Sequence, residues 1–183
     1  MSFLLDTNIC SAVIRDDRRV FNRLIQHAGR LSTSSIVLGE LYAWAYGSVN
    51  PQRLLDDIDD LLKDLVVLEF DDACAQEFGK LKGPLRRQGI NVAPLDLLIA
   101  STAIAHGFTL VTHNTKDFAN IPSLTVMDWL EPEHPPRPIP PHPLPDLAST
   151  SSLPASARSG RRISELLGRR RLVAGEAVVL NKS

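Results

Sequence analysis

The stretch Phe3-Leu4-Leu5-Asp6-Thr7-Asn8 places a carboxylate directly after three consecutive apolar residues. Such an apolar run predicts a short buried strand, and the polar residues after it predict the turn where the strand ends. Burying an unpaired carboxylate costs several kcal/mol, so such groups are usually paired or bound to a metal ion. Asp6 is therefore either the N-cap of a following helix or a metal ligand at a strand end, and this stretch alone leaves both alternatives open.

Three further carboxylates lie beside apolar runs. Glu40 stands inside the stretch 36–44, Asp96 precedes the stretch 97–100, and Asp117 follows a third apolar run. Each has an ordinary alternative: a buried Lys or Arg partner for Glu40, a helix dipole for Asp96 and a turn for Asp117. A chain without a metal site would need all of these separate explanations to be true at once. The pattern of four carboxylates therefore favours a divalent-cation site.

The fold expected from the hydrophobic pattern is α/β. Strands are predicted at 2–5, 31–34, 66–69, 109–112 and 124–127, and helices at 8–14, 18–28, 35–47, 51–63, 71–88 and 95–106. Prolines stand where first helical turns should begin, and glycines stand near four helix ends, where a left-handed conformation is favoured: Pro51 and Pro94, and Gly29, Gly47, Gly89 and Gly107. Short apolar strands separated by helices predict a mostly parallel sheet covered on both faces.

The acidic residues are expected to converge in this fold. Asp6 and Asn114 follow predicted strands, while Glu40 and Asp96 stand in the first turn or two of helices that leave the same sheet edge. Ligands of open α/β sheets bind outside the carboxyl ends of the strands. Thr7 and Asn8 would orient Asp6 or contact a phosphate there, and His113 is either a substrate contact or a loop residue.

Charge and cysteine content limit the class of protein. Residues 1–130 carry 12 Lys and Arg against 16 Asp and Glu, which argues against nucleic-acid binding through bulk positive charge. Cys10 and Cys74 are the only cysteines and lie far apart in apolar surroundings, so we expect reduced core positions in a cytoplasmic protein. The acidic run 56–60 is expected to be a solvated helix face, and no signal peptide or membrane span is predicted.

The composition changes at residue 131. Nine of the 13 prolines fall between residues 132 and 154, and arginines cluster beyond them. Proline-rich sequence of this kind cannot form a helix or a central strand, and an isolated short basic helix is marginal in water. We therefore expect a folded domain at 1–130 and a disordered tail at 131–183.

Four ordered motifs together resemble the PIN-domain ribonucleases, and among them the VapC toxins of type II toxin–antitoxin systems. These motifs are Leu4-Leu5-Asp6-Thr7-Asn8, Ser34-Ser35-Ile36-Val37-Leu38-Gly39-Glu40-Leu41, Pro94-Leu95-Asp96-Leu97-Leu98-Ile99-Ala100 and Leu110-Val111-Thr112-His113-Asn114-Thr115-Lys116-Asp117-Phe118. The resemblance covers about residues 1–130 and has the family's order and spacing.

The resemblance implies a three-layer α/β/α domain that cleaves RNA with Mg²⁺ or Mn²⁺, forms a homodimer and is neutralised by a cognate antitoxin. It makes Asp6 and Asp96 the principal metal ligands and Glu40 the third acid. Many members have an acid directly after the fourth strand, where this chain has Asn114; a second metal would need Asp117. By this resemblance a tRNA anticodon loop is a plausible target.

Three rival functions fit the sequence less well. A haloacid-dehalogenase-type phosphatase normally has a second acid two positions after the first, where this chain has Asn8. A receiver-like domain has its key Asp after the third strand, and Glu69-Phe70-Asp71 fits that pattern poorly. A catalytically silent PIN-like module that binds RNA or an antitoxin is the remaining alternative, and metal-dependent turnover would distinguish it from a nuclease.

Overall fold

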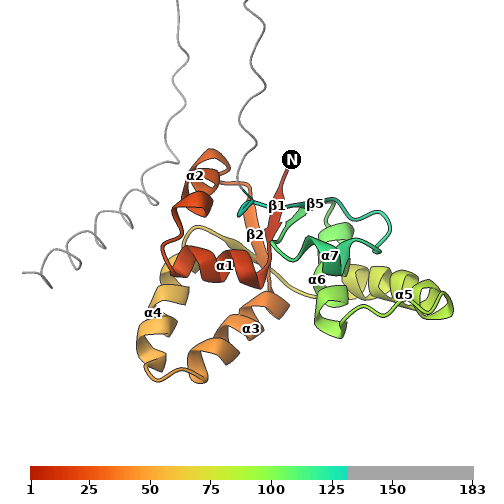
Figure 1. Cartoon of the computed structure of the whole chain (residues 1–183), viewed down its shortest axis with the longest axis horizontal. Coiled ribbons are helices and arrows are strands. Elements are labelled where there is room, and N and C mark those ends of the chain that lie inside the picture. The colour runs from red at the N-terminus through yellow and green to blue at the C-terminus, as the bar shows by residue number, and fades with distance from the viewer. Residues whose placement is uncertain (132–183) are drawn as a thin grey trace, which may run out of the picture.

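The computed structural model describes residues 1–131, which fold around a five-stranded parallel sheet (Figure 1). The strand order is β3-β2-β1-β4-β5, and every neighbouring pair is parallel. The strands are β1 (Phe3–Leu5), β2 (Leu31–Ser34), β3 (Val66–Leu68), β4 (Thr109–Val111) and β5 (Val126–Met127). Each lies within its predicted range, and the prediction of a mostly parallel sheet is confirmed.

Helices cover both faces of this sheet. They are α1 (Thr7–Ile14), α2 (Arg18–Gln26), α3 (Ser35–Tyr46), α4 (Pro51–Leu62), α5 (Asp72–Arg87), α6 (Pro94–Ala105) and α7 (Thr115–Phe118). Figure 1 shows α1 to α4 on one side of the strands and α5 to α7 on the other, as the α/β/α prediction requires. The first six were predicted to within two residues at each end, whereas α7, a single turn, was not predicted.

Short polar side chains begin several of these helices. The hydroxyl of Ser34 accepts a hydrogen bond from the Val37 amide at the start of α3, and Asp71 accepts one from the Cys74 amide at the start of α5. Pro51 and Pro94 stand in the first turns of α4 and α6, as predicted. Such caps satisfy amide groups that the helix itself leaves unbonded.

One of the four predicted left-handed glycines was wrong, although the helix end itself was predicted correctly. Gly29, Gly89 and Gly107 adopt positive φ angles of 80°, 71° and 66°, as expected for left-handed positions near helix ends, but Gly47 has a φ of −80°. The end of α3 needs no left-handed residue because the next side chain closes it. The Ser48 hydroxyl donates to the Ala45 carbonyl oxygen at 2.8 Å.

The core lies between the sheet and its helices. Leu4, Leu5, Leu110 and Val111 are fully buried in the central strands. In the acidic helix α4, Ile58 is buried, while Asp56 and Asp59 are exposed, so the predicted solvated face is confirmed. The two cysteines are free and buried, also as predicted.

Two further expectations from the sequence concern membrane-spanning helices and the segment after residue 130. Within residues 1–131, no helix is both long and apolar enough to cross a membrane. Residues 132–183, which carry the proline-rich and basic sequence, lie outside the described residues. The proposed boundary at residue 130 and the disorder of the tail stay predictions.

Candidate active site

Asp6 lies at the carboxyl end of β1, where the strand order changes direction. The chain leaves β1 toward β2 on one side and returns to β4 on the other, which is the switch point where open α/β sheets bind ligands. The side chain is only 5% exposed. Burial raises the pKa of the Asp6 carboxyl above its ordinary value, against the hydrogen bonds that lower it.

Hydrogen bonds fix both oxygens of this carboxylate. Oδ1 accepts from the Thr7 amide at 2.7 Å, and Oδ2 accepts from Asn8 Nδ2 at 2.8 Å and from the Thr112 hydroxyl at 2.6 Å. Asp6 is thus the N-cap of α1, as its ordinary alternative required, while its role as a metal ligand stays a prediction. The orientation is set before any ligand arrives.

Thr112 is a site residue that the sequence argument missed. Its hydroxyl donates to Asp6 and accepts from both Asn8 Nδ2, at 2.9 Å, and the Asn114 amide, at 3.1 Å. The signal was present in the sequence, because Thr112 is the first polar residue after the apolar strand β4. It was treated only as the end of that strand.

Asn8 orients its neighbours with all the polar atoms of its amide. Its Nδ2 bonds to Asp6 and Thr112, and its Oδ1 accepts from the His113 amide at 2.9 Å. Of the two roles expected from the sequence, orienting Asp6 is the one supported by the geometry. The His113 ring is directed to a different partner, with Nδ1 2.8 Å from Asp128 Oδ2, and the residue is exposed in a loop, as one of its two alternatives required.

Glu40 approaches the same edge from the second turn of α3. The Thr7 hydroxyl donates to its Oε2, and the negative charge of Glu40 contributes to raising the pKa of Asp6. The alternative of a buried Lys or Arg partner is wrong, because no cationic side chain among residues 1–131 forms an ion pair with Glu40. Thr7 therefore links Asp6, through its amide, to Glu40, through its hydroxyl.

Asp96 and Asp117 complete the acidic cluster from the other side. Asp96 is in the first turn of α6, and Asp117 is exposed in α7. Partial burial raises the pKa of Asp96, and the charges of Asp6, Asp117 and Glu40 raise it further. The charges of three acids from other elements therefore act on Asp96, as convergence at one sheet edge predicts.

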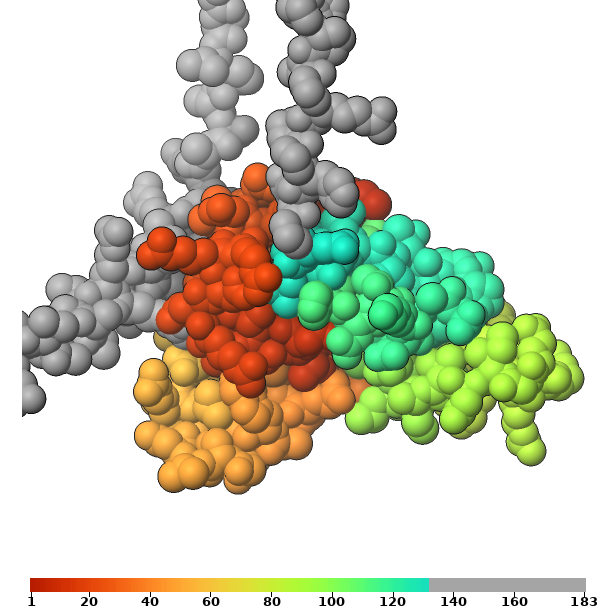
Figure 2. Space-filling view, viewed as in Figure 1, coloured from red at the N-terminus to blue at the C-terminus, as the bar shows by residue number. Residues whose placement is uncertain are grey.

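The cluster is open rather than tightly closed. No three of these carboxylates bring their oxygens within 4.8 Å of one another in the described part of the chain. Repulsion between unpaired carboxylates accounts for this spacing, which leaves room for an ion that keeps some of its waters. Figure 2 shows the N-terminal, α3 and α6–α7 segments, in red, orange and green, meeting on one face of the molecule.

Asn114 contributes through its backbone. It is the N-cap residue of α7, and its amide donates to Thr112, but its side chain makes no capping hydrogen bond. The residue is exposed. The described contacts therefore leave the Asn114 side chain available to a substrate, whereas the Asn8 side chain is occupied.

The sequence matches the family model of the PIN domain over residues 3–124. The chain belongs to the PIN-domain family. Among similar proteins is the tRNA(fMet)-specific endonuclease VapC of Shigella flexneri, 36% identical over 130 residues, which are 70% of this chain and 98% of that protein. Ribonuclease VapC2 of Rickettsia felis is 36% identical over 132 residues, which are 70% of this chain and 98% of that protein. The resemblance to VapC toxins within the PIN family is confirmed.

Solved structures agree with this assignment. VapBC2 from Rickettsia felis bound to a promoter DNA fragment has a TM-score of 0.67 and 36% identity, covering 70% of this chain and 99% of that chain. DNA-bound VapBC from Salmonella typhimurium has a TM-score of 0.68 and 34% identity, covering 70% and 98%. The part of this chain that aligns with these structures is thus about as long as the described segment, residues 1–131.

Proposed function

We propose that this chain is the toxin of a type II toxin–antitoxin pair and acts as a metal-dependent endoribonuclease. The observation that carries the proposal is the convergence of Asp6, Glu40, Asp96 and Asp117 at the switch point of the sheet. None of the four forms an ion pair with a cationic side chain of residues 1–131. A group of mutually repelling acids in a PIN domain related to VapC ribonucleases is best explained by a cation.

The donor chemistry of the cluster supports Mg²⁺ or Mn²⁺. Carboxylate oxygens and waters are the ligands these hard ions prefer, and the open spacing suits an ion that stays partly hydrated. Asp6 and Asp96 would be the principal ligands and Glu40 the third acid. Asp117 would join a second ion or hold a water.

The protein's contribution to catalysis is mainly orientation. Thr7, Asn8 and Thr112 hold the Asp6 carboxylate in one rotamer, which keeps the site's geometry fixed as RNA binds. The chemistry that a bound Mg²⁺ supplies is polarisation of the scissile phosphate and a lower pKa for an attacking water. The exposed side-chain amide of Asn114 would donate to a phosphate oxygen of the RNA.

The substrate we infer is a single-stranded RNA loop. Loops present unstacked bases that side chains can reach, whereas the deep, narrow major groove of an RNA helix hides its base edges. The Shigella relative is named as specific for tRNA(fMet), which makes a tRNA anticodon loop the first target to test.

The direct test is cleavage of total cellular RNA by the full chain in Mg²⁺, followed by mapping of the new 5′ ends. We expect cuts concentrated at one or a few loop positions, abolished by excess EDTA and restored by excess Mg²⁺ or Mn²⁺. Equal cleavage with and without chelator would contradict the metal-dependent mechanism. A folded chain without turnover under any metal would favour the silent binding module.

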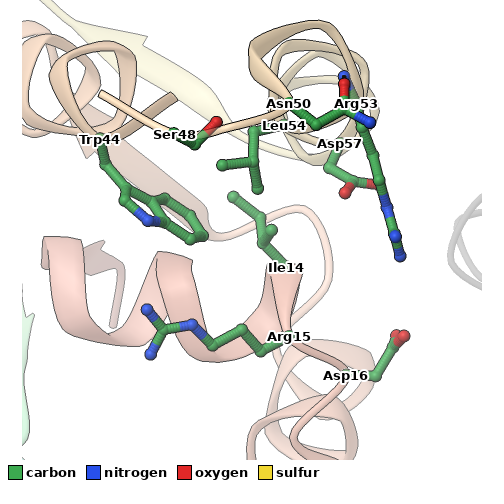
Figure 3. Close-up of a pocket in the computed structure, with 9 residues that line it drawn as sticks. All are labelled: Ile14, Arg15, Asp16, Trp44, Ser48, Asn50, Arg53, Leu54 and Asp57. Carbon is green, nitrogen blue, oxygen red and sulfur yellow. Dashed lines mark hydrogen bonds between the residues drawn. The ribbon is translucent and has the colours of Figure 1, made fainter. Parts of the chain in front are cut away.

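An antitoxin partner is the second part of the proposal, and a pocket at the end of α1 opposite to Asp6 is a suitable place for it. The pocket has a volume of about 420 Å³ between the end of α1 and the facing parts of α3 and α4. Figure 3 shows Ile14, Trp44 and Leu54 facing its interior and the Arg15 guanidinium beside the Trp44 ring, 5.1 Å from its centroid. Trp44 is one helical turn beyond Glu40, so a segment seated here would contact the same helix that carries the third acid.

Trp44→Ala is expected to weaken binding of a cognate antitoxin by about thirtyfold or more. Buried tryptophans at interface centres contribute about 2 kcal/mol or more, and 1.4 kcal/mol corresponds to tenfold in affinity. Titration calorimetry with the purified partner measures the change. Val66→Ala, at an exposed position on the edge strand β3, is the control. If the Trp44 variant bound the antitoxin with unchanged affinity, the antitoxin would bind elsewhere on the chain. The homodimer predicted from the resemblance is not tested by this experiment.

A further inference from the structure

A second group of metal-binding side chains lies away from the acidic cluster, where α5 begins and α6 ends. Cys74 is in the first turn of α5, three positions after the N-cap residue Asp71. His106 is the C-cap residue of α6. Figure 1 shows α5 projecting from the body of the molecule beside α6. The packing of these two helices brings together residues that are 32 positions apart in the sequence.

The three side chains present their donor atoms to one another. Cys74 Sγ is 3.8 Å from His106 Nε2, and the thiol, the imidazole and an Asp71 carboxylate oxygen all lie within 4.8 Å of each other. The Asp71 side chain also accepts from the Cys74 amide at 2.9 Å, which ties the carboxylate to the first turn of α5. The cluster is therefore partly arranged before an ion binds.

These distances suit a tetrahedral ion. Zn–S and Zn–N bonds of about 2.3 Å and 2.0 Å place sulfur and nitrogen about 3.5 Å apart at a tetrahedral angle. The observed separation of 3.8 Å needs only a small closing movement of flexible side chains. Thiolate, imidazole and carboxylate together form a donor set that Zn²⁺ takes readily and Mg²⁺ does not.

The group is distinct from the acidic cluster in position as well as chemistry. Asp96 stands at the start of α6 and His106 at its end, so ten residues of helix separate them by about 15 Å. An ion at the far end of α6 would thus not replace the cation proposed for RNA cleavage.

We propose that Asp71, Cys74 and His106 form a second metal site that binds one Zn²⁺ ion, with a water molecule as the remaining ligand. The Cys74 thiol loses its proton to solvent as the sulfur–zinc bond forms, while His106 binds through neutral Nε2. The bound ion joins the start of α5 to the end of α6. Its effect on the protein is stabilisation of this helix pair.

Cobalt titration of the metal-free full chain tests the proposal, because Co²⁺ adopts the same geometry and reports sulfur ligation by absorption. Excess Mg²⁺ is present throughout to occupy the acidic cluster. We expect a sulfur-to-cobalt charge-transfer band that saturates at one Co²⁺ per chain and disappears on addition of Zn²⁺. Absence of this band in the wild-type chain would overturn the proposal.

Three variants assign the ligands. Cys74→Ser should abolish the band, and His106→Gln should weaken Co²⁺ binding by at least about tenfold, since even loss of an outer-shell partner costs 10–100-fold. Asp71→Asn keeps an oxygen for capping the Cys74 amide but removes the carboxylate, so it should weaken binding similarly without unfolding α5. Circular dichroism checks that each variant is folded.

Cys10→Ser is the matched control. Burial raises the pKa of the Cys10 thiol to about 12, and this residue lies in the core beside Thr33, so it should contribute nothing to the band. A charge-transfer band that persists in Cys74→Ser would overturn the proposal. So would Co²⁺ binding that is unchanged in both Asp71→Asn and His106→Gln. A band lost in Cys10→Ser would do the same.

Discussion

Asp96→Asn is expected to lower the rate of RNA cleavage by at least about a thousandfold. Substitution removes one negative charge from the proposed metal-binding cluster, which also includes Asp6 and Glu40. Metal coordination supplies several kcal/mol of transition-state stabilisation, and each 1.36 kcal/mol corresponds to a factor of ten in rate. Initial rates on a purified tRNA in excess Mg²⁺ measure the loss. Asp59→Asn, an exposed acid on α4, should leave the rate unchanged.

Stability measurements on Asp96→Asn show whether a loss of RNA cleavage comes from the missing carboxylate or from unfolding of the variant. Partial burial, with the charges of three neighbouring acids, raises the pKa of Asp96 in the folded state. Its contribution to the free energy of unfolding is therefore fully present below the ordinary Asp pKa of about 4 and is lost as pH rises through the raised value. The Asn variant does not titrate and avoids this loss.

In chelator near neutral pH, Asp96→Asn should consequently melt at a higher temperature than the wild-type chain. The difference should disappear below about pH 4, where the wild-type carboxyl is protonated. Adding Mg²⁺ should raise the melting temperature of the wild type more than that of the variant, because binding to the folded state stabilises it. A variant less stable than wild type at every pH would show that Asp96 supports the fold and would weaken its assignment as a ligand.

The sequence predicted the acidic cluster because its members stand at fixed points of a parallel α/β fold. Asp6 ends a strand, and Glu40 and Asp96 begin helices, so their meeting follows from the common direction of the strands. Local apolar patterns of this kind are strong enough to predict element type and approximate bounds. The strand order itself has no local signal and came only from the structure.

Other contacts were unpredictable because they depend on how distant elements pack. Thr112 meets Asp6 across 106 sequence positions through neighbouring strands β1 and β4. Cys74 and His106 meet only because α5 packs on α6, and no local pattern connects a core cysteine with a helix-end histidine 32 positions away. The left-handed conformation predicted for Gly47 was wrong for a local reason. The hydroxyl of Ser48 satisfies a carbonyl that a left-handed glycine would otherwise help to cap.

Trp129→Ala is expected to lower the free energy of unfolding by about 3–5 kcal/mol, the usual cost of deleting a buried tryptophan side chain. Trp129 is 2% exposed, and its ring packs on Phe3 at 5.3 Å and stacks on His27 at 5.4 Å between ring centroids. Beside it, Arg19 donates to the Leu130 carbonyl oxygen at 3.1 Å. The chain directly after β5 is therefore joined to β1 and to the helical layer, although it comes last in the described sequence.

This loss is large against a typical total stability of about 5–15 kcal/mol, so the variant should be partly unfolded at physiological temperature. Urea denaturation followed by far-ultraviolet circular dichroism measures it without relying on tryptophan emission. Trp44→Ala is the matched control, since the only other tryptophan is half-buried and its removal should cost clearly less. A Trp129 variant with an unchanged midpoint would mean that the folding unit ends before this residue, and the domain proposed to run to residue 130 would have to be shortened.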